Sequence, residues 1–198
     1  MKNLISLAIL LTLTIGCIDQ RFSNNTIELP QVDQFTSVYS QNTKFNFINS
    51  MSDTLVMISD YQKTTVERSL PDDSTFFIDD YIIQLHSESK GILIVLLGTA
   101  FISADFEIIN PSLNILLMPR DRNSLGMDIR IEEMFATSTD ETEIFDSLEL
   151  LNKGFSTAYS VNSPEQSSFS QLYYNEEYGV IGFRDENNIL WRIDSVEQ

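Results

Sequence analysis

Short β-type runs, separated by turn signals, are the feature that most constrains the fold of this 198-residue chain. Beyond residue 35 the apolar residues either alternate with polar ones or form short continuous blocks, and no run keeps a helical period of about 3.6 residues. Strands produce both patterns, because successive residues of a strand point to opposite faces. The sequence therefore predicts an all-β fold, an antiparallel β-sandwich or barrel of many short strands and hairpins.

Two β-hairpins are expected from the turn residues between strand-like runs. Residues 43–60 form the first, with residues 50–52 in its turn. The second lies in residues 147–161, where residues 152–154 supply a three-residue connection with Gly154 in the left-handed conformation.

A third hairpin is expected to pair residues 180–184 with residues 189–193 across the loop 185–188. That register sets Gly182 opposite Trp191, so that the indole covers the missing side chain of the glycine. Trp191 is accordingly expected to lie in the core and not to stack on a ligand.

The middle of the chain adds further strand-like runs. They are residues 76–86, 92–98, 106–110, 113–119 and 127–134. Residues 110–112, Asn-Pro-Ser, are expected to form a turn. The longest apolar run, Ile92–Ile102, contains Gly98 and is too short for a spanning helix, so we expect a central strand covered on both faces.

The only cysteine, Cys17, follows an apolar segment that starts near the first residue. Lys2 precedes the apolar run Leu4–Ile15, and Gly16 stands directly before the cysteine. The run is shorter than the ~20 residues that a membrane-spanning helix needs. This order is typical of an export signal that is removed by cleavage.

Residues Leu13 to Cys17 resemble the lipobox of bacterial lipoproteins, in which small residues precede a cysteine that becomes the acylated N-terminus. Thr14 stands where that family usually has leucine. The resemblance implies that the sulfur of Cys17 carries a lipid and is neither a nucleophile nor a redox group. The alternative is an ordinary secretory signal cut after Gly16.

The polar composition that follows Cys17 indicates a tether, because it offers too little apolar surface to repay ordering. The expected organisation is a signal peptide at residues 1–16, a lipidated cysteine with a flexible tether at residues 17–34, and a single all-β domain at residues 35–198.

The chain is strongly acidic, with 29 acidic and 12 basic residues and a formal net charge of −17. Removal of Lys2 with the signal would make the charge of the mature chain −18. Such a surface repels nucleic acids and anionic lipid headgroups. The expected partners are therefore the membrane, through the N-terminal lipid, and an envelope protein or glycan of unknown identity, with nucleic acid excluded.

Few residues could support catalysis. His86 is the only histidine, which excludes multi-histidine zinc sites and leaves a serine triad without a choice of base. The acidic pairs Asp72–Asp73 and Asp79–Asp80 are adjacent in sequence, and neighbours on a strand point to opposite faces, so neither pair can form a two-carboxylate site. We expect no enzyme and no cofactor.

A weak calcium-loop candidate begins at Asp121. Asp121, Asn123, Gly126 and Glu132 occupy the first, third, sixth and twelfth positions of an EF-hand-like loop. Leu125 stands at a ligand position, and the flanking residues have strand character. The alternative is a polar turn with Gly126 in the left-handed conformation.

Residues 42–59, 146–161 and 173–194 resemble, in order and composition, small, uncharacterised cell-envelope lipoproteins of Bacteroidota-type bacteria. The resemblance implies an envelope location, anchored to the outer membrane on its periplasmic or surface face, and implies no activity. Proteins of this lineage can be O-glycosylated where Asp precedes Ser or Thr and a small or aliphatic residue. The matching acceptors are Thr54, Ser74, Ser147 and Ser195, with ordinary turn chemistry as the alternative.

We expect a membrane-anchored structural or interaction protein without a catalytic site. The alternative is a binding module for a small molecule or glycan in a sheet cleft, for which Tyr173, Tyr174 and Tyr178 are the nearest candidates. An enzyme is the third reading, and it would need converging carboxylates.

Overall fold

The computed structural model describes most of the chain from residue 26 onward. The described residues are 26–27, 30–69, 75–87, 89, 91–102, 108–119, 125–132, 135–138, 142–162 and 169–198. The chain divides into two compact units, one made of residues 1–28 and 65–79 and the other of residues 29–64 and 80–198.

Strands make up nearly all of the regular structure in the described residues, which confirms the prediction of an all-β fold. The single helix among them is α2 (Pro30–Thr36). The strands are β1 (Thr26–Ile27), β2 (Lys44–Ile48), β3 (Thr54–Ser69), β4 (Thr75–Ser87), β5 (Ile92–Ile102), β6 (Ile108–Pro119), β7 (Leu125–Glu132), β8 (Phe135–Ser138), β9 (Thr142–Leu150), β10 (Lys153–Asn162), β11 (Gln171–Asn175), β12 (Gly179–Arg184) and β13 (Leu190–Glu197).

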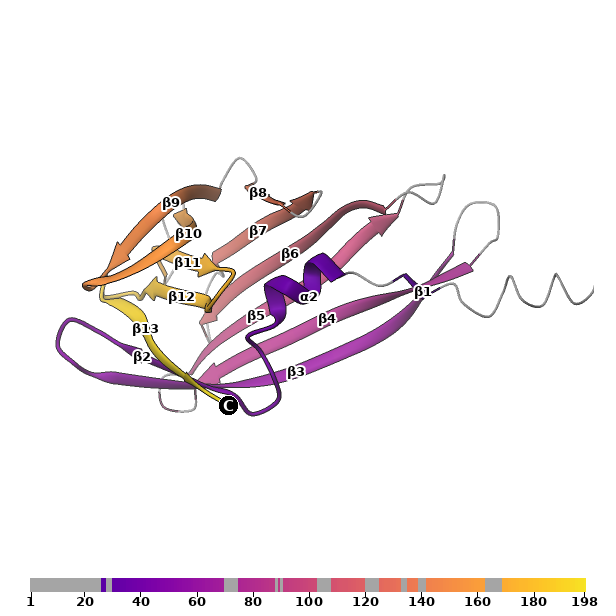
Figure 1. Ribbon diagram of the computed structural model, residues 1–198. Coiled ribbons are helices and arrows are strands. Elements are labelled where there is room, and N and C mark those ends of the chain that lie inside the picture. Colours follow the sequence, from indigo (N-terminus) through magenta and orange to yellow (C-terminus); the bar gives the residue numbers. More distant parts are fainter. Residues whose placement is uncertain are drawn as a thin grey trace, which may run out of the picture. The chain divides into compact units, whose positions relative to one another are not determined.

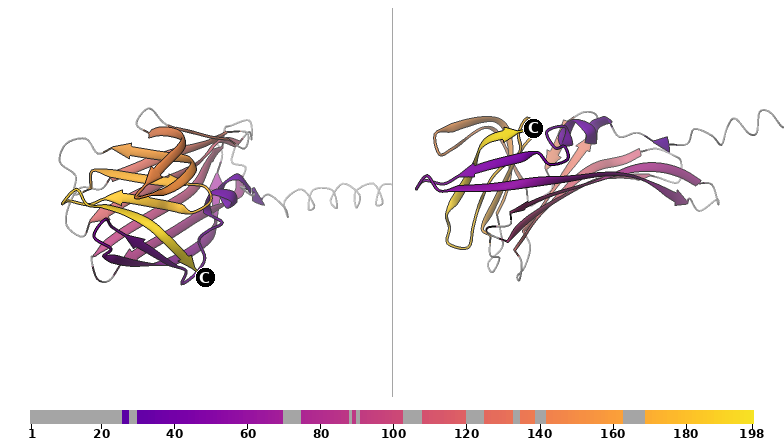
Figure 2. Two further views of the ribbon diagram at one scale, coloured as in Figure 1. Left: turned by 60° about the vertical axis from the view of Figure 1, so that its left-hand side comes forward. Right: turned by 90° about the horizontal axis from the view of Figure 1, so that it is seen from below.

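The strands follow one another in the order β8-β7-β6-β5-β4-β3-β2-β13-β12-β11-β10-β9, with β1 beside β4 (Figure 1). Most neighbours in the sheet are neighbours in sequence, and the pairing of β13 with β2 joins the two halves of the chain. In the second unit the end strands β8 and β9 lie close together, so the sheet curves into a nearly closed barrel (Figure 2).

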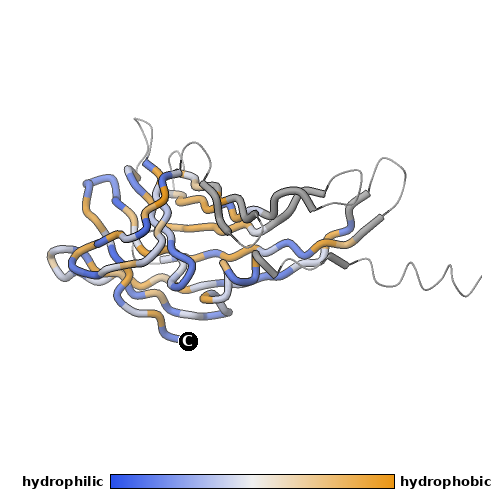
Figure 3. The backbone as a smooth tube through the Cα atoms, turned by 45° about the horizontal axis from the view of Figure 1, so that its top comes forward, coloured by the Kyte–Doolittle hydropathy of each residue, from blue (hydrophilic) through white to orange (hydrophobic). Residues whose placement is uncertain are grey.

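Alternation along the strands fills the interior of this curved sheet. Hydrophobic and hydrophilic residues succeed one another along much of the strand backbone (Figure 3). On β4 the inward residues Tyr81, Ile83 and Leu85 are buried, and the intervening Gln84 and His86 are exposed. The period of two therefore separates core from surface as the sequence predicts.

The first unit contains β1 and the adjoining ends of β3 and β4. β1 pairs in parallel with β4, with Ile27 opposite Ile78. Across the two long strands, Thr65 Oγ1 donates a hydrogen bond of 2.8 Å to Asp79 Oδ1. Asp79 is almost fully buried, and this bond supplies one of the hydrogen bonds that a buried carboxylate needs.

In the second unit, helix α2 packs against β5 and β6. Val32 and Phe35 of the helix are buried. Pro30 suits the first helical position, because it lacks only an N–H that would have no partner there. This helix lies partly in residues 17–34, for which the sequence predicts a flexible tether, so ordered structure begins before the expected boundary at residue 35.

The first two expected hairpins are present, with one corrected turn. β2 pairs with β3 in the expected segment, Lys44 opposite Ile58 and Ile48 opposite Thr54. β9 pairs with β10, but the turn consists of Leu151 and Asn152, which have φ angles of 45° and 62°. The expected connection through residues 152–154 is wrong, because two residues with positive φ suffice for a tight hairpin.

The third hairpin forms with a register that differs by one residue from the prediction. Gly182 lies opposite Arg192, and Trp191 lies opposite Phe183. The loop extends to Ile189, because Asp185 Oδ1 accepts hydrogen bonds from the backbone of Asn187 and Ile189. The indole therefore does not cover Gly182.

Two further expectations about β6 and β7 are wrong. Residues 110–112 do not form a turn, and β6 continues through Pro111, which lies opposite Ala100 beside a shift in the register. Proline is tolerated in a strand at such an irregularity. Gly126 lies in β7, where it pairs with Leu116 of β6, and it does not have a left-handed φ.

Candidate functional site: the polar cluster at the β13 bulge

Several residues singled out in the sequence lie outside the described residues. Cys17, Ser74, Asp121 and Asn123 are among them, as are Asp72 and Asp73. Of the calcium-loop candidates, Glu132 is the last residue of β7. The lipidation and calcium hypotheses therefore stay predictions.

Three expected modification sites lie in the described part of the second unit. Thr54 begins β3, Ser147 lies in β9 and Ser195 lies in β13, and all three side chains are exposed. Exposure is what an acceptor hydroxyl needs if an enzyme is to reach it. His86, by contrast, is an exposed residue of β4 opposite Leu93.

A β-bulge in β13 creates the most distinctive polar site of the second unit. Ile193 lies opposite Phe47 and Ser195 opposite Asn46, so Asp194 is an extra residue without a partner on β2. The bulge leaves backbone carbonyl groups of β13 outside the regular ladder, and these groups need other donors.

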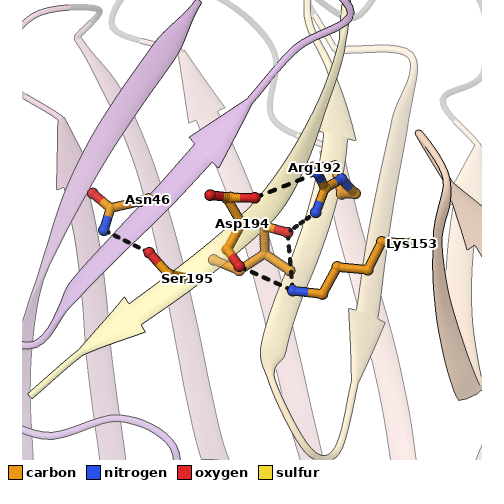
Figure 4. A network of polar contacts seen from close by, with 6 residues as sticks. Asn46, Lys153, Arg192, Asp194 and Ser195 are labelled. Carbon is orange, nitrogen blue, oxygen red and sulfur yellow. Dashed lines mark hydrogen bonds and ion pairs between the residues drawn. The ribbon is translucent and has the colours of Figure 1, made fainter. Parts of the chain in front are cut away.

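Two cationic side chains supply these donors (Figure 4). Lys153 Nζ at the start of β10 donates to the carbonyl oxygens of Asp194 at 3.0 Å and Ile193 at 3.4 Å. Arg192 donates from one terminal nitrogen to Ile193 O at 2.8 Å, and its other terminal nitrogen lies 3.4 Å from Asp194 Oδ1. The tip of the β9–β10 hairpin is thereby attached to β13.

The surroundings of Lys153 are aromatic and cationic. Its ammonium lies 5.0 Å from the ring centroid of Tyr178 and 5.6 Å from that of Phe155. Burial, followed by the positive charge of Arg192, holds the pKa of Lys153 below its usual value. Cation–π contacts and the carbonyl bonds compensate the ammonium for this desolvation.

Arg192 is almost fully buried, and its Nε atom has no hydrogen-bond partner. Opposite it, Gly182 is required: a Cβ there would lie 2.6 Å from Trp191 O and 3.3 Å from Leu150 Cδ1. Leu150 of the β9–β10 hairpin, and not Trp191 as the sequence predicts, thus fills the space above Gly182.

The bulge also presents one of the predicted modification sites. Asp194 and Ser195 are both exposed although they are consecutive. Ser195 Oγ accepts a hydrogen bond of 3.0 Å from Asn46 Nδ2 on β2. The cluster therefore fixes the backbone around Ser195 while its side chain stays on the surface.

The tyrosines considered for ligand binding are packing residues. Tyr173 and Tyr174 are buried, and Tyr178 is half-buried with its ring edge-on to Phe155. Trp191 is 3% exposed, which confirms that it lies in the core, and its Nε1 donates to Asp185 Oδ2 at 3.0 Å.

Sequence reasoning missed an interior group of tyrosines that holds the helix region. Tyr174 Oη donates to the carbonyl of Phe35, and Val180 N donates to Tyr39 Oη at 2.8 Å. Tyr159 Oη donates to Glu176 Oε1 at 3.2 Å. Burial raises the pKa of each of these three phenols, so they stay neutral donors or acceptors across the physiological range.

The described residues contain no group of three or more His, Cys, Asp or Glu side chains placed to hold a metal ion. No helix in the described ranges has the length and apolar character needed to cross a membrane. Comparison of the chain with family models, curated proteins and solved structures found no match.

Proposed function

We propose that this protein is a lipid-anchored component of a bacterial cell envelope whose β-rich part acts in structure or interaction and not in catalysis. Cys17 is the proposed attachment point. Its sulfur would carry the lipid, and the all-β units would be held at the membrane without spanning it.

The observation that carries this proposal is the position of the sole cysteine. Cys17 directly follows Gly16 and an apolar run, Leu4–Ile15, that is preceded by Lys2. A sole cysteine cannot form an internal disulfide, and the position directly after a signal-like segment is the one that a lipid attachment requires. The negative charge of the chain also favours a lipid anchor over binding through charge to anionic lipids.

The character of the folded part is consistent with the proposal. The second unit has a continuous apolar core and buries Tyr173 and Tyr174, two of the three tyrosines that were candidates for an aromatic binding platform. Its strongest polar cluster uses Lys153 and Arg192 to hold β13 and the β9–β10 hairpin together. These are the features of a stable scaffold, and its exposed strand faces are available for partners.

Expression of the full chain in a bacterium with labelled fatty acid tests the anchor. The unaltered chain should incorporate the label and sediment with membranes. Cys17→Ser should lose both properties and yield a soluble chain with an unchanged β-type circular dichroism spectrum, because Cys17 is the only cysteine of the chain and closes no internal disulfide.

Ile18→Ser is the matched control, since it alters the neighbouring residue and keeps the thiol. This variant should be labelled and should sediment as the unaltered chain does. Continued labelling of Cys17→Ser would overturn the proposal. It would also be overturned if the unaltered chain and Ile18→Ser were labelled but did not associate with membranes.

A further inference from the structure

Strands β4, β5 and β6 carry apolar residues on their outward side as well as toward the core. On β5 the inward Ile94 and Leu96 are fully buried, whereas the outward Leu93 and Leu97 are only half-buried. The outward Val95 between them is buried as well, so the prediction that this strand is covered on both faces is fulfilled on its inward side and only in part on its outward side. An ordinary antiparallel sheet with one solvated face would place polar residues at these outward positions.

The register brings these outward residues together. Leu97 lies opposite Ile82, Val95 opposite Leu116, and Leu93 opposite Met118. Residues directly opposite each other in a sheet have their Cβ atoms about 5 Å apart, so the three pairs form one continuous surface. We call it the outer apolar patch, and its members are Ile82, Leu93, Val95, Leu97, Leu116 and Met118.

The polar residues within these rows are not acidic. Gln84 lies opposite Val95, His86 opposite Leu93, and Asn114 opposite Leu97. By comparison, β9 of the same unit exposes Glu143, Asp146 and Glu149. In a chain with 29 acidic residues, three successive rows without a carboxylate on β4, β5 and β6 are a marked local exception. The nearest carboxylates border these rows: Asp80 is the next outward residue of β4, and Asp128 of β7 lies opposite Asn114.

We propose that the outer apolar patch rests on the surface of a neutral phospholipid bilayer, with its side chains at the boundary between headgroups and acyl chains. This inference rests on the proposed anchor at Cys17. Residues 18–29 separate that anchor from helix α2 of the second unit, and twelve residues span at most about 40 Å when extended. The second unit is thereby confined to the vicinity of the membrane, where an apolar face free of carboxylates is the one that approaches lipid at least electrostatic cost.

A second copy of the chain is a poorer occupant, because each chain carries a formal charge of −17 and two such chains repel each other. A neutral bilayer has no such charge. The anchor also holds the patch at a high local concentration of lipid. A contact that would be too weak to recruit an unanchored chain can therefore form.

Fluorescent labelling at single positions tests the orientation. The full lipidated chain has no free thiol, because Cys17 carries the lipid, so Leu116→Cys and the matched control Ser147→Cys can each be labelled with an environment-sensitive dye. Leu116 lies in the patch, and Ser147 is exposed on β9. Both proteins are placed in phosphatidylcholine vesicles, with and without a nitroxide-bearing phosphatidylcholine, and unchanged circular dichroism verifies that they are folded.

The dye at position 116 should be quenched several-fold more strongly than the dye at position 147 and should show a blue-shifted emission. Equal quenching at the two positions, in chains that float with the vesicles, would overturn the proposed orientation and leave the anchor standing. Chains that fail to float would overturn the anchor and the orientation together. A Cys17→Ser chain that sediments as a dimer, and as a monomer after Leu116→Glu, would show that a second copy covers the patch.

Discussion

The absence of a side chain at Gly98 allows helix α2 to pack closely against β5. A Cβ at this position would overlap Val32 Cγ1 of α2 and would lie 3.2 Å from Tyr81 Cβ. Since Val32 is fully buried, the helix has no free space into which it could retreat. The glycine that interrupts the apolar run Ile92–Ile102 thus has a packing role and not a turn role.

Gly98→Ala should therefore lower the free energy of unfolding by about 1–3 kcal/mol, the usual cost of overpacking a core. Chemical denaturation monitored by fluorescence measures the change. The double variant with Val32→Ala should recover part of the loss, because the truncated side chain leaves room for the new methyl group. Strict additivity of the two changes would show that they do not share a contact.

Tyr81 gives a prediction about alkaline pH. Burial, assisted by the nearby Asp33, raises the pKa of Tyr81 from 10.0 to about 12. The unfolded chain therefore loses this proton first as the pH rises, so the contribution of Tyr81 is complete below pH 10.0 and is lost toward a pH of about 12. Tyr81→Phe should show a shallower fall of unfolding free energy over this interval, and parallel curves for the two proteins would disprove the assignment.

The elements of the second unit are held together by the core and also by the hydrogen bonds from Lys153 on β10 to the bulge of β13, which we call the clamp. Lys153→Met keeps most of the side-chain length but removes the ammonium that donates to the carbonyls of Ile193 and Asp194. We expect the free energy of unfolding to fall by about 1 kcal/mol, because the Asp194 carbonyl loses its charged donor while the Ile193 carbonyl keeps its bond from Arg192. Lys44→Met, at an exposed position on β2, should change stability by no more than about 0.5 kcal/mol, and an equal effect of both would contradict the clamp.

At the level of elements, the strands were predictable and the helix was not expected. Val32, Phe35, Thr36 and Tyr39 recur at helical spacing and all four are buried, so a local signal was present. It spans only two turns and lies in a polar segment, where it is easily read as a tether. The turn 151–152 and the register of β12 with β13 depend on backbone conformation and on Asp185, which residue type alone does not determine.

The site was less predictable than the fold. Ser195 and Thr54 match a short modification pattern that can be read from the sequence, but the cluster of Lys153, Arg192 and Asp194 joins residues about forty positions apart. That juxtaposition results from the bulge in β13 and from the tip of the β9–β10 hairpin reaching β13, and neither follows from a sequence pattern. The outer apolar patch likewise emerges only when the register of β4, β5 and β6 is known.

The whole molecule combines three properties: an all-β fold, a strongly acidic composition and a sole cysteine behind a signal-like segment. We propose that the protein gains its location from its N-terminus and its contacts from its strand faces. The proposed lipid at Cys17 is therefore the central claim, since the orientation of the outer apolar patch depends on it.

Mass spectrometry of the N-terminal peptide of the mature protein, isolated from bacterial membranes, tests this claim most directly. The account predicts a chain that begins at Cys17, with a diacylglycerol on the sulfur and an additional mass corresponding to fatty acid on the amino group. A mature chain that begins at any other residue, or one that begins at Cys17 with an unmodified thiol, would contradict it.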